Sequence, residues 1–384
     1  MLEKALTGSR KYWLLVFSLL AIIGVGFGTY LYQLREGLTV TGMGRDVSWG
    51  LYIGQMTFLV GVAASAVMVV LPYYLHNYKA FGKVTILGEF LAVAAITMCA
   101  LMILVDLGQP SRGINIILYP SPKSVMFWDL ISFAGYFTLN IVIGWTVLGA
   151  EKKSVPPPKW VKPLIYISIP WAVSIHTVTA FLYSGLGGRS FWFTAILAPR
   201  FLASAFAAGP SLLILLMYLL RKHTSFNAGK DAFQTLAKIV TYAMILNVFF
   251  VFLELFTALY SGVHEHILHF EYLYFGLGEN TAAVFSMWLS AALAVFSLIL
   301  LINPKTRQKD GFLILACISV FISLWIEKGM ALVVTGFVPN PLDQVVEYFP
   351  TVPEVLITLG VYGIGFFILT VLYKVVISVR DSHA

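Results

Sequence analysis

Long apolar segments recur along the whole chain and decide what it can fold into. A helix needs about 20 predominantly apolar residues to cross a bilayer, and about ten segments of the 384-residue sequence meet that requirement. We therefore predict an all-α integral membrane protein, a polytopic bundle of about ten transmembrane helices in a single transmembrane domain, residues 1–384. The predicted spans are 12–32, 50–72, 84–107, 125–149, 163–184, 200–221, 238–262, 281–303, 312–335 and 354–378.

The composition agrees with a membrane protein and excludes several cofactors. Hydrophobic residues make up 59% of the chain and charged residues only 11%, whereas about a quarter of the residues of soluble domains are charged. The two cysteines, Cys99 and Cys317, lie in apolar segments and form no CxxC, CxxCH or ferredoxin-type pattern. We therefore expect no covalent haem and no iron–sulfur cluster in this chain. Only His176 of the seven histidines lies within a predicted span, so a bis-histidine haem inside the membrane is not expected either.

Lysine and arginine indicate the orientation of the bundle. If the N-terminus is cytoplasmic, 18 of the 25 basic residues fall in inner segments, as the positive-inside rule requires. Both termini are then cytoplasmic, and the net charge of +7 reflects the inner loops rather than a nucleic-acid partner. The seven basic residues on the other side are Arg35, Arg45, Arg112, Lys123, Arg189, Arg200 and Lys328.

The predicted outer loops differ from the inner ones in composition. They are rich in Gly, Pro, Trp and Tyr, as in GLGGRSFWFTAILAPR, whereas inner loops such as EKKSVPPPKW are short and basic. Interaction residues concentrate on positioned loops, so we expect a partner or substrate on the outer side. The alternative is that these loops only connect helices.

A few ionisable residues fall within or at the ends of the predicted spans and are therefore functional candidates, because each costs at least about 2.5–3.5 kcal/mol at the bilayer centre. At a rise of about 1.5 Å per residue, His176 and Glu254 lie about 12 Å below the outer surface. We expect Asp106 and Asp129 at the outer surface itself. The full set is Glu89, Asp106, Asp129, His176, Glu254, Glu327 and Lys328.

Helical periodicity groups these residues into three polar faces that open outward. Such faces suit an amphipathic ligand with a polar head, and a quinone ring needs a hydrogen-bond donor at each carbonyl and a route for two protons. Histidine, tyrosine and carboxylates supply both. The faces are His176, Thr179 and Tyr183; Asn247, Glu254, Thr257 and Ser261; and Tyr52 with Gln55.

Each candidate also has a structural interpretation. His176 could join two helices, Glu254 could pair with Lys328 or Arg200, and Asp106 could form a turn-fixing salt bridge with Arg112. Nearer the inner surface, Glu89 could begin a proton path with Asn140 and Asn247. The loop histidines His264, His266 and His269 form HxHxxH, but this spacing fixes no ligand geometry and we expect no metal there.

One segment carries a family resemblance. The run VDLGQPSRGINIILYPSPKSVMFWD (Val105–Asp129) resembles the D-L-G-x-P-x-R…N/Y-P-x-S-x-M-x-W signature of the NrfD/PsrC family of quinone-interacting membrane subunits. The run Pro170–Leu216 and the Glu254 region, FLELFTALYSG, are similar to the ten-span branch of that family. The run Asp46–Lys83 is most similar to DsrP-type members, which belong to DsrMKJOP complexes of dissimilatory sulfur metabolism.

The resemblance implies a cofactor-free bundle in the cytoplasmic membrane of a prokaryote. Its outer face would dock an iron–sulfur, ferredoxin-like (DsrO-like) subunit, beside other membrane and haem subunits, and menaquinone would bind near that face. Asp106 and Arg112 fall on the outer-rim motif, His176 on the polar position of the fifth helix and Glu254 on the acid of the seventh. Tyr183 and Gln55 complete the predicted quinone and proton-transfer site.

The sequence departs from one pattern of the family and leaves two other functions open. Relatives in alternative complex III place a histidine in the second helix near the quinone, where this chain offers only Ser65. A transporter would use Glu254, Glu327 and Lys328 as its path and would show broken helices in matched halves. A purely structural membrane anchor would have its quinone site elsewhere.

Overall fold

The computed structural model describes residues 1–381 and confirms the all-α membrane architecture. Ten helical stretches are long and apolar enough to cross a membrane within this range. They are α1 (Arg10–Glu36), α2–α3 (Leu51–Ala63 and Val67–Leu75), α4 (Thr85–Asp106), α6 (Val125–Lys152), α7 (Val161–Ser184), α8 (Leu197–His223), α9 (Lys230–Ser261), α11 (Val284–Ile302), α13–α14 (Asp310–Leu324 and Leu332–Thr335) and α15 (Val352–Asp381).

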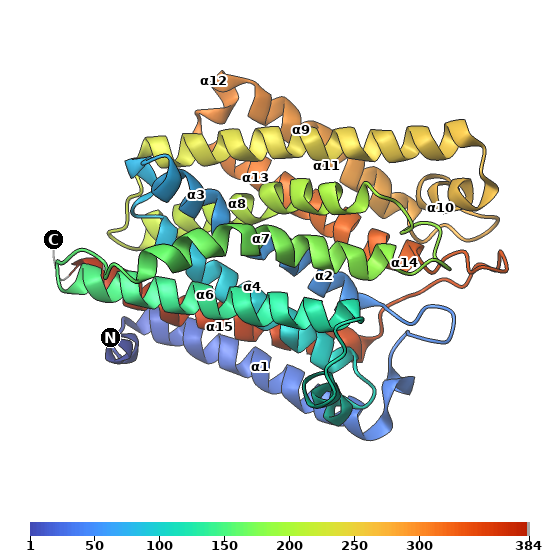
Figure 1. Cartoon of the computed structure of the whole chain (residues 1–384), viewed down its shortest axis with the longest axis horizontal. Helices are drawn as coiled ribbons and strands as arrows, with labels where there is room; N and C mark the ends of the chain where they lie inside the picture. The colour runs from blue at the N-terminus through green and yellow to red at the C-terminus, as the bar shows by residue number, and fades with distance from the viewer. Residues whose placement is uncertain (382–384) are drawn as a thin grey trace.

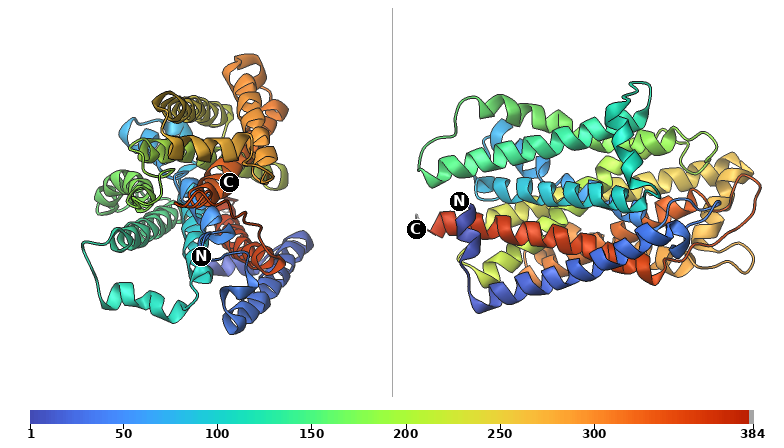
Figure 2. Two further views of the ribbon diagram at one scale, coloured as in Figure 1. Left: turned by 90° about the vertical axis from the view of Figure 1, so that its right-hand side faces the viewer. Right: turned by 90° about the horizontal axis from the view of Figure 1, so that it is seen from below.

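Eight of the spans form two rings of four helices. The first ring contains α2–α3, α4, α6 and α7, and the second contains α8, α9, α11 and α13. The rings meet where α2 packs against α8 and against the segment Trp325–Ala331 that follows α13. Figure 2 shows this arrangement along and across the bundle. The buried apolar core runs continuously through both rings.

The first and last spans pack together outside the rings. α1 lies along α15, and α15 in turn lies on α4. A Cβ placed on Gly26 of α1 would lie 2.5 Å from Cα of Gly360 on α15. The two backbones therefore touch at these glycines, the kind of close approach that small residues permit in membrane helix pairs.

Two spans expected to be continuous are interrupted. The second span breaks at residues 64–66, where the Ala64 amide donates to the Gly61 carbonyl instead of that of Val60. Alanines favour helix, so neighbouring packing imposes the break: a Cβ on Gly209 of α8 would lie 2.8 Å from the Ser65 nitrogen. The ninth span contains a π-helical segment, Trp325–Ala331, between α13 and α14. Segments of this kind occur frequently at functional sites.

The two ends of the bundle differ, as the loop compositions predict. The N-terminus and the last turn of α15 lie at the same end of the bundle as the short basic connections, including α12 (Pro304–Arg307) (Figure 1). The longer connections and α10 (His264–Tyr274) lie at the opposite end, which we call the loop end. There residues 107–124, which include α5 (Asn115–Leu118), project sideways from the bundle (Figure 2).

Candidate functional site

A buried ionic cluster joins three helical segments of the second ring. Arg200 on α8 donates through Nη1 to Oε2 of Glu254 on α9. The same guanidinium donates to Oε1 of Glu327, from Nη2 at 2.6 Å and from Nε at 3.2 Å. Asn247 of α9 donates to the other Glu327 oxygen at 3.0 Å. The structural pairing of Glu254 with Arg200, one of the two considered above, is therefore present.

Arg200 was expected in an outer loop and instead lies inside a helix. α8 begins at Leu197, three residues earlier than predicted, which places Arg200 in its first turns. Its side chain is 7% exposed, because a buried charge is tolerated where opposite charges and hydrogen bonds surround it. Sequence periodicity could not reveal this, since the partners lie 54 and 127 residues away.

The π-helical segment buries two adjacent charged residues. Successive residues of an α-helix point about 100° apart, and the extra residue of a π turn changes that register. Here Glu327 faces Arg200, while Nζ of Lys328 lies 4.0 Å from the centre of the Phe201 ring. That Nζ has no hydrogen-bond partner among the described residues. Lys328, one of the candidates expected within the spans, thus belongs to the buried cluster, which holds two carboxylates and two cations.

A cavity of about 310 Å³ opens beside Glu254, and we call it the Glu254 cavity. Residues 190–196, the outer half of α9 and α10 surround it, and most of its lining is apolar, with Ser190, Thr257 and His266 among its polar groups. Within residues 1–381, Oε1 of Glu254 has no hydrogen-bond partner, although Oε2 is tied to Arg200. The cavity has the size and character of a small-molecule pocket, with one acid in its wall.

The polar face predicted on the fifth span is present and fully buried. Nδ1 of His176 lies 2.7 Å from the Ala172 carbonyl, so Nδ1 carries the proton and Nε2 of the neutral ring is an acceptor. Tyr183 is 2.5 Å from the hydroxyl of Thr57, and Thr179 donates to Oδ1 of Asp129 at 2.8 Å. His176 lines a separate cavity of only about 10 Å³. The polar faces of the fifth and seventh spans therefore do not surround one common pocket.

The acids at the mouths of two helices do not form the exposed rim that was expected. Asp129 lies in the first turns of α6, at the loop end as expected, but its side chain is buried against Thr179. Asp106 is only partly exposed, and its Oδ1 lacks a partner in the described chain. Arg112 is exposed, and no ion pair joins it to Asp106 within residues 1–381. Arg112 lies away from Asp106 because it belongs to residues 107–124, the segment that projects sideways from the bundle.

Gln55 does not face the Glu254 cavity. Its Oε1 accepts from the Trp325 indole and from the Tyr362 hydroxyl, both at 2.7 Å. Tyr52, expected on the same face, donates to Gln33 at 2.6 Å. Gln55 thus connects the second span, the start of the π-helical segment and α15.

The residues considered for an inner proton path lie apart. Glu89 is buried on α4, and its Oε2 lacks a partner in the part of the chain that the structure describes. Asn140 on α6 bonds the carbonyl of Tyr136 one turn earlier. Asn247 belongs to the Arg200 cluster in the second ring, so no continuous contact of these three side chains is present.

The HxHxxH histidines lie on a helix, α10, rather than on a loop. Nδ1 of His269 is 3.1 Å from the Val338 carbonyl and its Nε2 is 2.9 Å from Ser190 Oγ. Burial lowers the pKa of His269 to about 4, so the ring is neutral and joins α10 to two connections. Within residues 1–381 no group of three or more His, Cys, Asp or Glu is placed to hold a metal ion.

Comparison with known proteins gives the family. Residues 39–338, which include both rings, match the family described as "Polysulphide reductase, NrfD". The chain belongs to the NrfD family. The resemblance in the Val105–Asp129 signature is thereby confirmed at the level of the family.

Several relatives resemble the chain over most of its length. A protein of Halobacterium salinarum, provisionally named as a membrane subunit of dimethyl sulfoxide reductase, is 28% identical, over 92% of this chain and 88% of its own. A selenate reductase subunit of Mesobacillus selenatarsenatis is 24% identical, over 96% and 94%. The Hdr-like menaquinol oxidoreductase integral membrane subunit of Archaeoglobus fulgidus is 24% identical, over 78% and 73%. These relatives are named as subunits of oxidoreductases.

Proposed function

We propose that this NrfD-family chain is the quinone-binding membrane subunit of an oxidoreductase complex. The observation that carries the proposal is the Glu254 carboxyl group, with one oxygen held by Arg200 and the other unpartnered, in the wall of a mainly apolar cavity. Two relatives named for menaquinol or menaquinone agree with a quinone as the ligand. The cavity lies at the loop end, where loop composition predicts the partner.

The cavity suits the ring of a naphthoquinone such as menaquinone. Its volume of about 310 Å³ lies at the lower end of the range for small-molecule pockets, and Phe191, Phe193 and Phe270 supply aromatic surface. The carboxylate oxygen of Glu254 that has no partner is a hydrogen-bond acceptor for a quinol hydroxyl. Oxidation of the quinol releases two electrons and two protons. The electrons would pass to an iron–sulfur, ferredoxin-like partner, Glu254 would accept one proton, and the other would leave to solvent at the loop end.

The remaining assignments are part of the same proposal. The termini are cytoplasmic, because basic residues concentrate at their end of the bundle, and the membrane is the cytoplasmic membrane of a prokaryote. Asp106, Gln55 and Tyr183 take part in proton transfer within the first ring, and Arg112 belongs to the exposed segment at the loop end. The similarity of Asp46–Lys83 to DsrP-type subunits favours a complex of dissimilatory sulfur metabolism, with a DsrO-like partner and haem subunits.

A Glu254→Gln variant of the purified complex tests the proposal. The amide keeps the size of the side chain but cannot accept the proton, so quinol-linked electron transfer should fall by roughly 10²-fold while the complex still assembles. Binding of a soluble naphthoquinone should weaken as well. Glu271→Gln, which changes an exposed carboxylate on α10, is the matched control. Normal turnover and normal naphthoquinone affinity in Glu254→Gln would refute the assignment.

Ion translocation is a second candidate because two spans are interrupted beside buried charges. The break at residues 64–66 lies in the first span of one ring, and the π-helical segment lies in the last span of the other. Transporters built from two repeated halves show interruptions in corresponding helices of the halves. The two interruptions in this chain do not correspond, because one lies in the first span of its ring and the other in the last. Proton uptake by vesicles containing the complex, measured without quinol, would favour this second function.

A further inference from the structure

Two buried nitrogen atoms without partners line the same small cavity between the two rings. Nε2 of His176 comes from the first ring and Nζ of Lys328 from the second, and neither has a hydrogen bond within residues 1–381. Both residues are at most 3% exposed. Buried polar groups are nearly always hydrogen-bonded, so two exceptions at one cavity call for an explanation.

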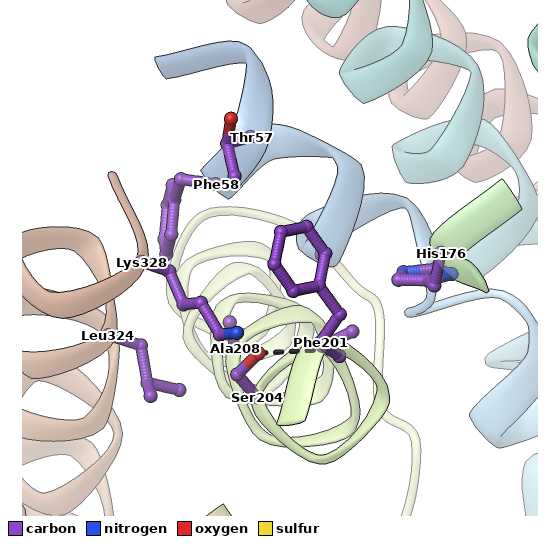
Figure 3. Close-up of a pocket in the computed structure, with 10 residues that line it drawn as sticks. Thr57, Phe58, His176, Phe201, Ser204, Ala208, Leu324 and Lys328 are labelled. Carbon is purple, nitrogen blue, oxygen red and sulfur yellow. Dashed lines mark hydrogen bonds between the residues drawn. The ribbon is translucent and has the colours of Figure 1, made fainter. Parts of the chain in front are cut away.

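Figure 3 shows how the two groups lie. The ring of Phe201 stands between the Lys328 amine and the His176 imidazole, and it lies 4.0 Å from Nζ. The free volume is about 10 Å³, enough for about one water molecule. The neighbouring wall is built from small residues, Gly61, Ala205 and Ala208. The Phe201 ring is therefore the bulky side chain that limits how much water this space can hold.

Both irregular spans contribute to this cavity. The π-helical segment turns Lys328 inward next to Glu327. The break at residues 64–66 releases the Val60 carbonyl from the Ala64 amide, and the Val60 backbone lies next to the His176 ring. One end of the cavity thus has the Lys328 amine as a cationic donor. The other end has Nε2 of His176 as an acceptor, next to the Val60 backbone.

We propose that Lys328 and His176 are the two ends of a proton relay between the rings, with the Phe201 ring as its gate. The relay rests on the proposed function, since it starts when Glu254 gains a proton from the quinol. The cluster holds two carboxylates and two cations, so a proton gained by Glu254 leaves one positive charge in excess. Lys328 then releases one proton to water admitted beside Phe201, and that water passes one proton to Nε2 of His176. One proton moves and the charge is conserved.

Lys328→Met in the purified complex tests the relay. Naphthoquinol oxidation should slow by at least about tenfold, within the range for loss of a positioned proton-transfer group, and its solvent hydrogen isotope effect should change. Naphthoquinone affinity should stay as in the wild type. Phe201→Leu, which opens the gate, should leave the rate undiminished and lower the isotope effect.

Gly61→Ala tests the cavity while keeping every ionisable group. The added methyl would meet Ala205 at 3.4 and 3.7 Å, which is ordinary contact, and should slow oxidation by displacing water. Gly28→Ala is the control, because a methyl there meets nothing within 4 Å and lies on α1, outside both rings. Wild-type rates in both Lys328→Met and Gly61→Ala would overturn the relay. Loss of naphthoquinone binding in Lys328→Met would also overturn it, by assigning Lys328 to the quinone site. Normal turnover together with normal naphthoquinone affinity in Glu254→Gln would instead refute the proposed function.

Discussion

Arg200 and Glu327 are joined by two hydrogen bonds that converge on one carboxylate oxygen, at 2.6 and 3.2 Å from Nη2 and Nε. The contact ties the start of α8 to the π-helical segment of the ninth span. Because the same guanidinium also holds Glu254, one arginine neutralises two carboxylates inside the bundle. The stability of the second ring and the state of the Glu254 cavity therefore depend on one side chain.

Replacing Arg200 should destabilise the protein strongly. Arg200→Gln leaves two buried carboxylates without their cation, and removing one partner of a buried ion pair typically costs about 3–5 kcal/mol. Thermal unfolding of the purified protein in detergent should shift to markedly lower temperature. Arg112→Gln, which changes an exposed arginine at the same end, should not shift it. Equal unfolding temperatures for the two variants would contradict a stabilising role for the cluster.

Glu354 should control the order of the connection between the first two spans. Its Oε2 accepts from the amides of Gly42 and Thr351 at 2.7 and 2.8 Å, and its Oε1 accepts from Tyr348 at 2.5 Å. The side chain of the Glu354→Gln variant carries an N–H group, which cannot accept a hydrogen bond from these donors. The variant therefore loses charge-assisted hydrogen bonds, each of which is worth about 1.5–3 kcal/mol. Hydrogen exchange of residues 40–50 should accelerate. Glu279→Gln, at an exposed position, serves as control, and unchanged exchange in Glu354→Gln would exclude this role.

His269 should make the stability of the loop end depend on pH. Its pKa is lowered to about 4, mainly by burial, with the charges of His266 and Arg189 acting in the same direction. Between about pH 6.5 and 4 the unfolded chain binds a proton that the folded chain does not, so the free energy of unfolding should fall as the pH falls. The loss should approach roughly 3 kcal/mol at pH 4.

The measurement is thermal unfolding of the wild type and of His269→Gln across that pH range. The glutamine variant should lose this part of the pH dependence, because it does not titrate. The prediction fails if both proteins respond to pH in parallel.

The contact between α1 and α15 can be tested with two glycines of one helix. Gly26→Ala places a methyl 2.5 Å from Cα of Gly360, whereas a methyl on Gly28 meets nothing within 4 Å. Overpacking typically costs about 1–3 kcal/mol, so Gly26→Ala should lower the unfolding temperature. Gly28→Ala should leave it equal or slightly higher, since alanine favours helix over glycine. A larger loss in Gly28→Ala would contradict the close contact.

Much of the site chemistry could be predicted from the sequence, but its connections could not. Glu254, His176 and Lys328 stand out as ionisable residues in apolar segments, because burial in a membrane makes such residues costly. Glu254 lines one cavity, whereas His176 and Lys328 line another. This division follows from how the two rings pack, and it could not be predicted because helical periodicity describes only one helix at a time. Gln55 shows the same limit, since its partners Trp325 and Tyr362 lie 270 and 307 residues away.

The ten spans, the concentration of basic residues at one end and the membership of the NrfD family follow from the amino-acid sequence, because they depend on local composition and on matching motifs. The break at residues 64–66 and the π-helical segment around Lys328 arise from packing in three dimensions. Neither segment contains a proline, and the one glycine, Gly329 in the π-helical segment, is tolerated inside many membrane helices. Both irregularities lie where the two rings meet, and the contacts that stabilise them come from side chains distant in sequence.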